Sequence, residues 1–288
     1  MTAAPFLKFP AGARLEAMGG TSAAGAQGCE AVFYNPAGIV IGSKSPRSDL
    51  GLGYSNLLTG ANAGSVAYAL SIGRNGTVAG GLVYFAHGGQ TAYDAKGDPV
   101  GQFSPSDFAL SAAYAHAFAG GKVRAGGLIK AIRSSLQSES AGAAAVDLGA
   151  QALGLVSLGD GPLDLGVSVS NLGMPMRLGG VSQALPLHLR GGFLWRVNPM
   201  LNAAMDGHLP VDDDPYMSLG VELLATVGKA GSAAVRAGYN QAHMRGIDGF
   251  AGATAGAGLD LGWLRVDYAW SPYGELGHVN RANLAFRF

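Results

Sequence analysis

The feature that most constrains the fold is a strict alternation of apolar and polar residues at the end of the chain. In residues 280–288 (NRANLAFRF) every second side chain is apolar, and residues 263–271 (WLRVDYAWS) repeat the pattern. Successive side chains of a β-strand point to opposite faces, so both segments are predicted to be strands with one apolar face. Two such strands, with charges on the other face and aromatic residues near the ends, are typical of the wall of a membrane β-barrel.

The composition supports a membrane barrel over a soluble domain. The chain has 288 residues, of which 48% are hydrophobic and 13% charged, whereas about 25% charged is typical of soluble domains. The sequence contains no run of the ~18 apolar residues that a membrane-spanning helix needs. Apolar content without apolar runs indicates alternating strands that face lipid. Because the formal net charge is zero, the sequence gives no electrostatic reason to expect a nucleic-acid partner.

Alternation continues through most of the chain. The predicted strands lie near residues 49–56, 65–73, 77–86, 107–118, 123–135, 144–155, 163–171, 187–197, 200–209, 218–227, 233–241, 251–261, 263–271 and 279–288. Each is close to the roughly 9–11 residues with which a tilted strand crosses a bilayer. The sequence therefore predicts an all-β fold, a 14-stranded antiparallel transmembrane β-barrel over residues 48–288. Such a barrel is expected in the bacterial outer membrane, in contact with its lipid.

The connections between these strands alternate in length. Short turns such as 74–76, which contains the hairpin pair Asn75-Gly76, are followed by longer links. The longer links are 87–106, 137–142, 173–186, 210–217, 242–250 and 272–277. Short periplasmic turns and longer external loops are characteristic of outer-membrane barrels. The pattern places both termini on the periplasmic side.

Charged side chains occupy the strand face opposite the apolar one. The predicted lumen charges are Arg124, Lys130, Asp147, Asp164, Arg190, Arg196, Glu222, Arg236, Arg265, Asp267 and Arg281, with Asp107, Asp260 and Arg287 on the same face. Basic and acidic residues nearly balance, so we expect the lumen to be laced with ion pairs rather than to present one sign of charge to a solute. The alternative, the solvated outer face of a soluble sheet, stays open at this point.

The first 47 residues differ from the rest. They show no sustained alternation, contain many glycines, and are too apolar for a disordered tail. We interpret residues 1–47 as a plug that enters from the periplasmic side and folds against the polar lumen. The single cysteine, Cys29, allows no intramolecular disulfide and is expected to be an ordinary small buried residue.

Residues 10–39 (PAGARLEAMGGTSAAGAQGCEAVFYNPAGI) resemble the signature of the PorV/PorQ group of FadL-type outer-membrane barrels. That signature has Gly-x-Arg, then Met-Gly-Gly, then Asn-Pro-Ala-Gly. The matching positions are Gly12, Arg14, Met18, Gly19, Gly20, Asn35, Pro36, Ala37 and Gly38. Glycines would let the plug pass close to the wall, Asn-Pro would form a rigid turn that directs the chain into the first strand, and Arg14 could pair with lumen carboxylates. The alternative is that these residues are structural only and hold the plug in place.

The resemblance implies two functions. Members close to the signature are accessory barrels of secretion or gliding machinery, such as the type IX system, and bind protein partners. Members of the wider family carry hydrophobic molecules such as long-chain fatty acids. Because the loops are short and the longest, 87–106, is polar, we favour the accessory barrel. A transporter with a hydrophobic ligand is the alternative, and a diffusion porin is disfavoured because porins use roughly 16–18 strands.

Enzymatic activity is not expected. The sequence has no Gly-x-Ser-x-Gly and no His-Glu-x-x-His motif. Asp206 and His208 share one strand face, near His243 and the run 212–214 of three aspartates. The aspartates could hold calcium, but we interpret them as a solvated loop. No catalytic residue, metal or cofactor is therefore assigned.

The chain ends on a pattern similar to the terminal signal by which bacterial outer-membrane barrels are recognised for insertion. Leu284, Phe286 and Phe288 are the predicted membrane-assembly signal. We expect deletion of Phe288, or Phe288→Ser, to impair membrane assembly much more than the stability of the folded barrel. Immunoblotting of membrane fractions and unfolding of the purified variant measure the two effects. Normal membrane levels would show that the pattern serves only lipid-facing packing.

Overall fold

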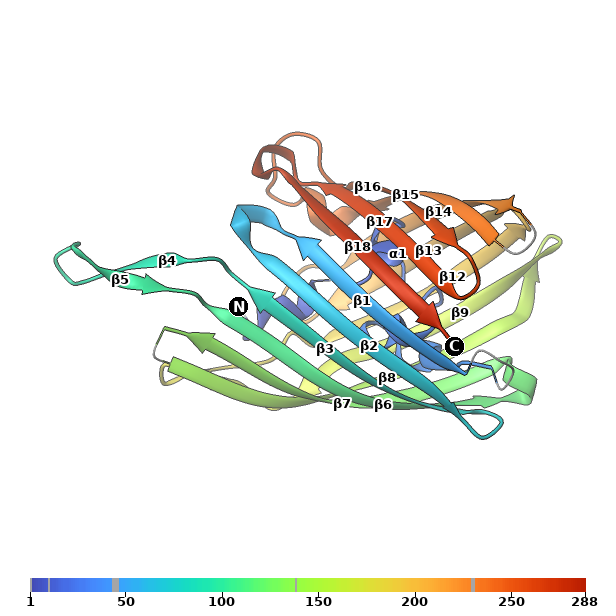
Figure 1. The fold of residues 1–288 in the computed structure, drawn as a ribbon, viewed down its shortest axis with the longest axis horizontal. Coiled ribbons are helices and arrows are strands. Elements are labelled where there is room, and N and C mark those ends of the chain that lie inside the picture. The colour runs from blue at the N-terminus through green and yellow to red at the C-terminus, as the bar shows by residue number, and fades with distance from the viewer. Residues whose placement is uncertain (1, 10, 43–46, 138, 229–230) are drawn as a thin grey trace.

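A computed structural model describes residues 2–9, 11–42, 47–137, 139–228 and 231–288. Most of the chain is β-strand (Figure 1). The strands of the main sheet are β1 (Ser48–Asn56), β2 (Asn62–Ile72), β3 (Gly76–Ala86), β6 (Ser106–Phe118), β7 (Val123–Leu136), β8 (Glu139–Leu158), β9 (Gly161–Gly173), β12 (His188–Asn198), β13 (Leu201–Pro210), β14 (Tyr216–Val227), β15 (Gly231–Asn240), β16 (Ala253–Asp260), β17 (Leu264–Pro272) and β18 (His278–Arg287).

These fourteen strands form one closed antiparallel barrel. Each strand pairs with the barrel strand before it and the one after it, and β1 pairs with β18 to close the wall. Closure removes sheet edges, which leaves no unpaired strand to attract another chain. The predicted fold class and strand count are confirmed.

The links at the two ends of the barrel differ in length. At the short-turn end lie the turns 73–75, 119–122, 159–160, 199–200 and 261–263. At the long-loop end lie the links 57–61, 87–105, 174–187, 211–215, 241–252 and 273–277. One predicted long link is wrong: pairing continues to Leu136 and Glu139, so 137–142 shrinks to a tight connection. Residue 138 of that link, and residues 229–230 of the predicted turn 228–231, lie outside the described residues.

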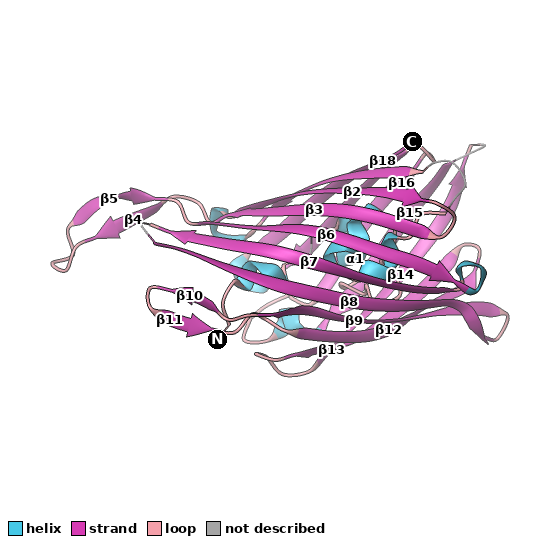
Figure 2. Cartoon of the chain, turned by 90° about the horizontal axis from the view of Figure 1, so that it is seen from below, coloured by secondary structure: helices cyan, strands magenta, loops and turns pink. Residues whose placement is uncertain are grey.

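Two links that were expected to be irregular contain hairpins. Strands β4 (Gln90–Tyr93) and β5 (Pro99–Phe103) project from the long-loop end, and β10 (Met176–Leu178) pairs with β11 (Val181–Gln183) (Figures 1 and 2). The β4–β5 turn is held by Asp94, whose side chain accepts hydrogen bonds from the backbone N–H groups of Lys96 and Asp98. Asx turns of this kind shape a polar loop without periodic apolar residues, so alternation could not reveal them.

The outer face of the barrel is apolar. Predicted outward side chains that are exposed include Val66, Tyr68, Leu70, Ile72, Phe108, Leu110, Tyr114, Leu165, Val167, Leu189, Leu219, Val221 and Leu223. Exposed apolar side chains on every second residue, around a closed wall, are what a lipid-facing barrel surface requires. The predicted division into outer and lumen faces is therefore confirmed for these strands.

Short helices of the N-terminal segment lie inside the barrel. They are η1 (Pro5–Lys8), α1 (Ala13–Glu16), η2 (Cys29–Phe33) and η3 (Pro36–Ile39). Figure 2 shows them in cyan between the magenta strands; α1 contacts β16, β17 and β18, and η3 contacts β6, β7 and β8. Cys29 is fully buried, as expected. Among the described helices, none is long and apolar enough to cross a membrane.

The two ends of the described chain lie at opposite ends of the barrel. Lys8 Nζ lies 2.5 Å from a carboxylate oxygen of Asp212, in a link at the long-loop end. The backbone N–H of Arg47 donates to the carbonyl of Phe288 at the short-turn end. The segment therefore runs through the lumen from one end to the other. The prediction that both termini share one side, with entry from that side, is wrong for the described residues, because the first turns of the segment pack among the long loops.

Depth along the outer face should decide the cost of a charge there. Val221, in the middle of β14, and Val227, at its short-turn end, have 44% and 45% of their surface exposed. We expect Val221→Arg to destabilise the barrel by about 2–4 kcal/mol and Val227→Arg by about 0–1 kcal/mol, because the penalty falls towards the interface. Urea titration of folding into lipid vesicles measures both. Equal losses would contradict a bilayer centred on Val221.

Candidate functional site: the lumen and its cavity

A chain of buried ion pairs crosses the lumen. Its members, in order, are Arg14, Glu222, Arg236, Asp267, Arg265 and Glu30, with N–O distances of 3.1, 2.8, 2.7, 3.0 and 3.4 Å between neighbours. The first and last belong to the N-terminal segment and the rest to β14, β15 and β17. Burial lowers the pKa of Arg14, but the Glu222 carboxylate outweighs burial and holds that pKa above its ordinary value. The network therefore ties the segment to the wall at both Arg14 and Glu30.

The remaining predicted lumen charges also point inward. Lys130 pairs with Asp147 at 2.9 Å, Arg281 with Glu16 at 3.4 Å, Arg287 with Asp260 at 3.0 Å, and Arg196 contacts Asp164. Within the described part of the chain, Arg124 and Arg190 make no ion pair. Most of the lumen charge is thus neutralised in place, and Arg190 lies where it lines a cavity.

The glycines and arginine of the predicted plug signature shape the first half of the segment. The Gly12 N–H donates to the Tyr34 hydroxyl at 2.6 Å at the start of α1. Gly19 and Gly20 follow α1 with φ of 72° and 83°, a backbone conformation that glycine adopts without strain. They turn the chain after Met18, which is buried against β12 and β13. These residues position the segment.

The Asn-Pro-Ala-Gly part of the signature forms a capped helix. The Asn35 side chain accepts from the Ala37 N–H at 3.1 Å and donates to the Ala23 carbonyl at 2.7 Å and to the Val167 carbonyl at 3.2 Å. Pro36 begins η3, and Gly38 lies against the segment's own backbone. The pair Asn35-Pro36 therefore docks the segment onto β9. That the pair directs the chain into the first strand stays a prediction, because residues 43–46 between η3 and β1 lie outside the described residues.

Inward glycines in the strands make room for the segment. A Cβ on Gly149 of β8 would overlap the Asn35 side chain, and one on Gly166 of β9 would overlap the backbone of Ala23. The strand backbone can approach the segment this closely only where no side chain intervenes. The sequence signal for this close packing is glycine at lumen-facing strand positions such as Gly149 and Gly166.

A cavity of about 210 Å³ lies between the segment and the long-loop end of the wall. Its lining combines apolar and aromatic side chains with polar ones. Among them are Leu7, Phe33, His188, Arg190, His208 and Tyr216. We call this space the lumen cavity. Arg190 lines this cavity together with the rings of His188, His208 and Tyr216, which belong to the neighbouring strands β12, β13 and β14.

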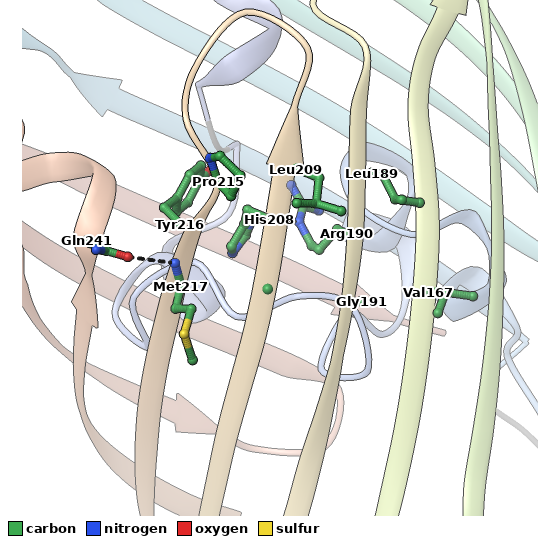
Figure 3. A pocket seen from close by; sticks show the side chains of 11 residues that line it. Val167, Leu189, Arg190, Gly191, His208, Leu209, Pro215, Tyr216, Met217 and Gln241 are labelled. Carbon is green, nitrogen blue, oxygen red and sulfur yellow. Dashed lines mark hydrogen bonds between the residues drawn. The ribbon is translucent and has the colours of Figure 1, made fainter.

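An apolar groove lies on the outer face of the same strands (Figure 3). This wall groove, of about 590 Å³, has Val167, Leu189, Leu209 and Met217 among its lining residues. Its floor includes the facing pair Gly191 and Gly207 on β12 and β13, which leave the backbone uncovered.

The wall groove and the lumen cavity share Arg190, His208 and Tyr216. The two spaces are therefore back to back across one thin strand layer.

A second outer groove, of about 760 Å³, lies over β6 to β9. Here the pairing of β8 and β9 shifts register between Val146 and Leu148, which marks a bulge. Asn171 of β9 takes a φ of 63°, and its side chain accepts from Lys130 at 2.8 Å. Small outward residues such as Ala131 and Ala144 leave the surface hollow. The outer face therefore carries this second apolar groove as well as the wall groove.

The acidic and histidine residues weighed for catalysis have other partners. The Asp206 carboxylate accepts from the backbone N–H groups of Ser22 and Ala23. Asp213 pairs with Arg245 at 2.8 Å. Among the described residues, no group of three or more His, Cys, Asp or Glu side chains is placed to hold a metal ion.

The predicted assembly signal lies on the outer face of β18 at the short-turn end. Leu284 and Phe288 are exposed and Phe286 is half-buried. The side chains therefore face outward, where a recognition signal or lipid would contact them.

Comparison with known proteins supports the barrel architecture. The toluene transporter TodX of Pseudomonas putida superposes with a TM-score of 0.62 and 14% identity over 95% of this chain and 96% of that chain. The toluene transporter TbuX of Ralstonia pickettii superposes with a TM-score of 0.59 and 15% identity over 96% of this chain and 98% of that chain. A FadL homologue of Pseudomonas aeruginosa superposes with a TM-score of 0.58 and 12% identity over 96% of this chain and 98% of that chain. No protein-family model matches the chain, and no curated protein matches it.

The structural neighbours are thus FadL-type outer-membrane barrels, and at these identities the likeness establishes the fold. The narrower resemblance to the PorV/PorQ group has no support from a family match.

The ion-pair chain predicts an uneven response to neutralising substitutions. Glu222→Gln leaves Arg14 without its carboxylate and Arg236 with Asp267 alone, so we expect a loss of about 3–5 kcal/mol in unfolding free energy. Asp260→Asn is the control, because Asp260 and Arg287 have side chains 30% and 26% exposed; there we expect at most about 1 kcal/mol. Urea unfolding followed by tryptophan fluorescence measures both. Similar losses would show that the lumen pairs behave like surface pairs.

Proposed function

We propose that this protein is an outer-membrane barrel that admits small hydrophobic molecules. The observation that carries the proposal is the back-to-back arrangement of the lumen cavity and the wall groove across Arg190, His208 and Tyr216. A solute in the cavity is separated from the apolar outer surface by one strand layer in which Gly191 and Gly207 have no side chains. The toluene transporters TodX and TbuX, which share the fold, support this class of solute.

The size of the lumen cavity favours small solutes. A cavity of roughly 150 Å³ holds benzene, and the lumen cavity measures about 210 Å³. A molecule with one ring therefore fits, whereas a long-chain fatty acid needs more space than this cavity offers. We accordingly narrow the solute class to molecules of about one aromatic ring.

We also propose that residues 1–47 act as a plug, of which residues 1, 10 and 43–46 lie outside the described part. The segment docks into the inward glycines and completes the ion-pair chain, which supports a lumen closed to ions. We place the long-loop end outside the cell and the short-turn end in the periplasm, as in other barrels of this kind. Catalysis, a metal and a cofactor have no role in this proposal, and protein partners have no support from the comparisons.

Filling the lumen cavity should slow uptake. Ser170 of β9 lines the cavity, whereas Ser157 of β8 is exposed at the other end of the barrel. We expect Ser170→Trp to reduce uptake of labelled toluene several-fold and Ser157→Trp to leave it unchanged. Initial uptake rates are measured in Gram-negative cells that lack other FadL-type barrels, with heat-modifiable gel migration as the check on folding. Uptake no faster than in cells without the protein would refute the transport function.

A further inference from the structure

Arg190 carries a positive charge that the lumen does not neutralise. It lies on β12 facing the lumen cavity, and it makes no ion pair within the part of the chain that the structure describes. By contrast, Arg14, Arg236 and Arg265 of the ion-pair chain each have a carboxylate oxygen within 3.4 Å. Arg190 is half-buried, but its Nη1 is buried and has no hydrogen-bond partner. Because a buried polar atom without a partner is costly, its position in a cavity favours a partner from outside the chain.

The nearby carboxylates are already engaged. Asp206 lies on the neighbouring strand one residue pair away; its Oδ2 accepts from the N–H groups of Ser22 and Ala23 at 2.6 and 2.8 Å, and its Oδ1 makes no hydrogen bond to Arg190 or to any other described residue. Asp212, on the cavity rim, is bound by Lys8 at 2.5 Å and by Thr2. Both carboxylates therefore hold the N-terminal segment in place rather than the guanidinium.

Two histidines are the observed partners of Arg190. Its Nε donates to His208 Nδ1 and its Nη2 to His188 Nδ1, each at 3.4 Å. A guanidinium has only donors, so both imidazole nitrogens must accept, which requires neutral rings. His208 Nε2 then donates to the Ser218 hydroxyl at 2.9 Å. The cluster thus carries one net positive charge, held by two long hydrogen bonds, and Nη1 has no partner.

An aromatic surface lies beside this charge. The rings of His208 and Tyr216 stack with centroids 4.3 Å apart and planes at 5°, and His188 stacks on His208 at 5.3 Å. In Figure 3 Tyr216, His208 and Arg190 lie in a row across three adjacent strands. Tyr216 stacks on His208 and has the Arg245 guanidinium over its ring, 5.7 Å from the centroid. Another ring can therefore pack against the edge of this stack. The site therefore joins a cation to an aromatic wall in a space of one-ring size.

We propose that Arg190 binds the carboxylate of a small hydrophobic acid, with the apolar body of the acid against Tyr216. This inference rests on the proposed function and narrows its solute class to small carboxylic acids, of which an aromatic acid is the best match. Guanidinium and carboxylate form charge-assisted, planar hydrogen bonds. A purely apolar solute would leave the guanidinium as it is, and an organic cation would be repelled by it.

The test compares three one-ring probes on the folded, full-length protein in detergent. Benzoate, toluene and benzylamine differ mainly in the charge of one substituent, and calorimetry gives their affinities at pH 7. We expect wild type to bind benzoate more tightly than toluene and benzylamine. Arg190→Gln should weaken benzoate by about tenfold or more, the size of a lost charge-assisted hydrogen bond, and should leave toluene unchanged. Arg177→Gln, which removes an exposed arginine of β10, is the matched control and should change neither.

The outcomes separate this inference from the proposed function. Benzoate that binds wild type no better than toluene or benzylamine overturns the inference, as does unchanged benzoate affinity in Arg190→Gln. If that variant does not fold, the order of the three probes on wild type decides alone. Toluene uptake by cells tests the function separately. Uptake of toluene without a preference for benzoate would support the transport function and refute the inference. A preference for benzoate without uptake of either probe would support the binding site and refute the transport function.

Discussion

The requirement that buried charges be paired underlies the organisation of this barrel. Six ionised side chains run from Arg14 through β14, β15 and β17 to Glu30, so the N-terminal segment supplies both ends of the network. Without Arg14 the Glu222 carboxylate would face Arg236 alone, and without the segment the lumen would need water to solvate its charges. Removing one partner from such a network leaves an uncompensated charge in a low-dielectric space. The wall and the segment are therefore one electrostatic unit, although paired residues of the network are separated by as many as 235 positions in the chain.

Filling of the lumen determines which space remains for function. The segment packs into strand glycines such as Gly149 and Gly166 and occupies the middle of the barrel. The lumen cavity is left at the long-loop end, with the apolar wall groove outside it. An interior filled by the segment leaves little room for an aqueous channel. A small apolar solute, by contrast, finds a cavity of its own size and an apolar surface one strand layer away.

The strand pattern was predictable because its cause is local. Alternation with a period of two follows from backbone geometry, and a wall with lipid outside and charges inside imposes it on every strand. The outward Val221 and the inward Glu222 could be assigned from that pattern alone. Where the cause is not local, the pattern failed: β8 extends from Glu139 to Leu158 and shifts register against β9, because bulges are set by the partner strand. Alternation does not reveal the hairpin β4–β5 either, but for a different reason. Hydrogen bonds of the Asp94 turn, rather than apolar periodicity, hold this hairpin.

The sequence by itself determined the barrel, its fourteen strands, the two faces of its wall and the inward set of charges. These follow from residue spacing and from the free energy of exposing apolar side chains to lipid and polar ones to the lumen. Only the tertiary structure decided which charges meet. Arg14 reaches Glu222, and Arg190 has two histidines in place of a carboxylate. It also decided that the segment crosses the whole lumen, from Lys8 at the long loops to Arg47 beside Phe288. Pairings over such distances depend on barrel closure, which brings together residues that no local pattern links.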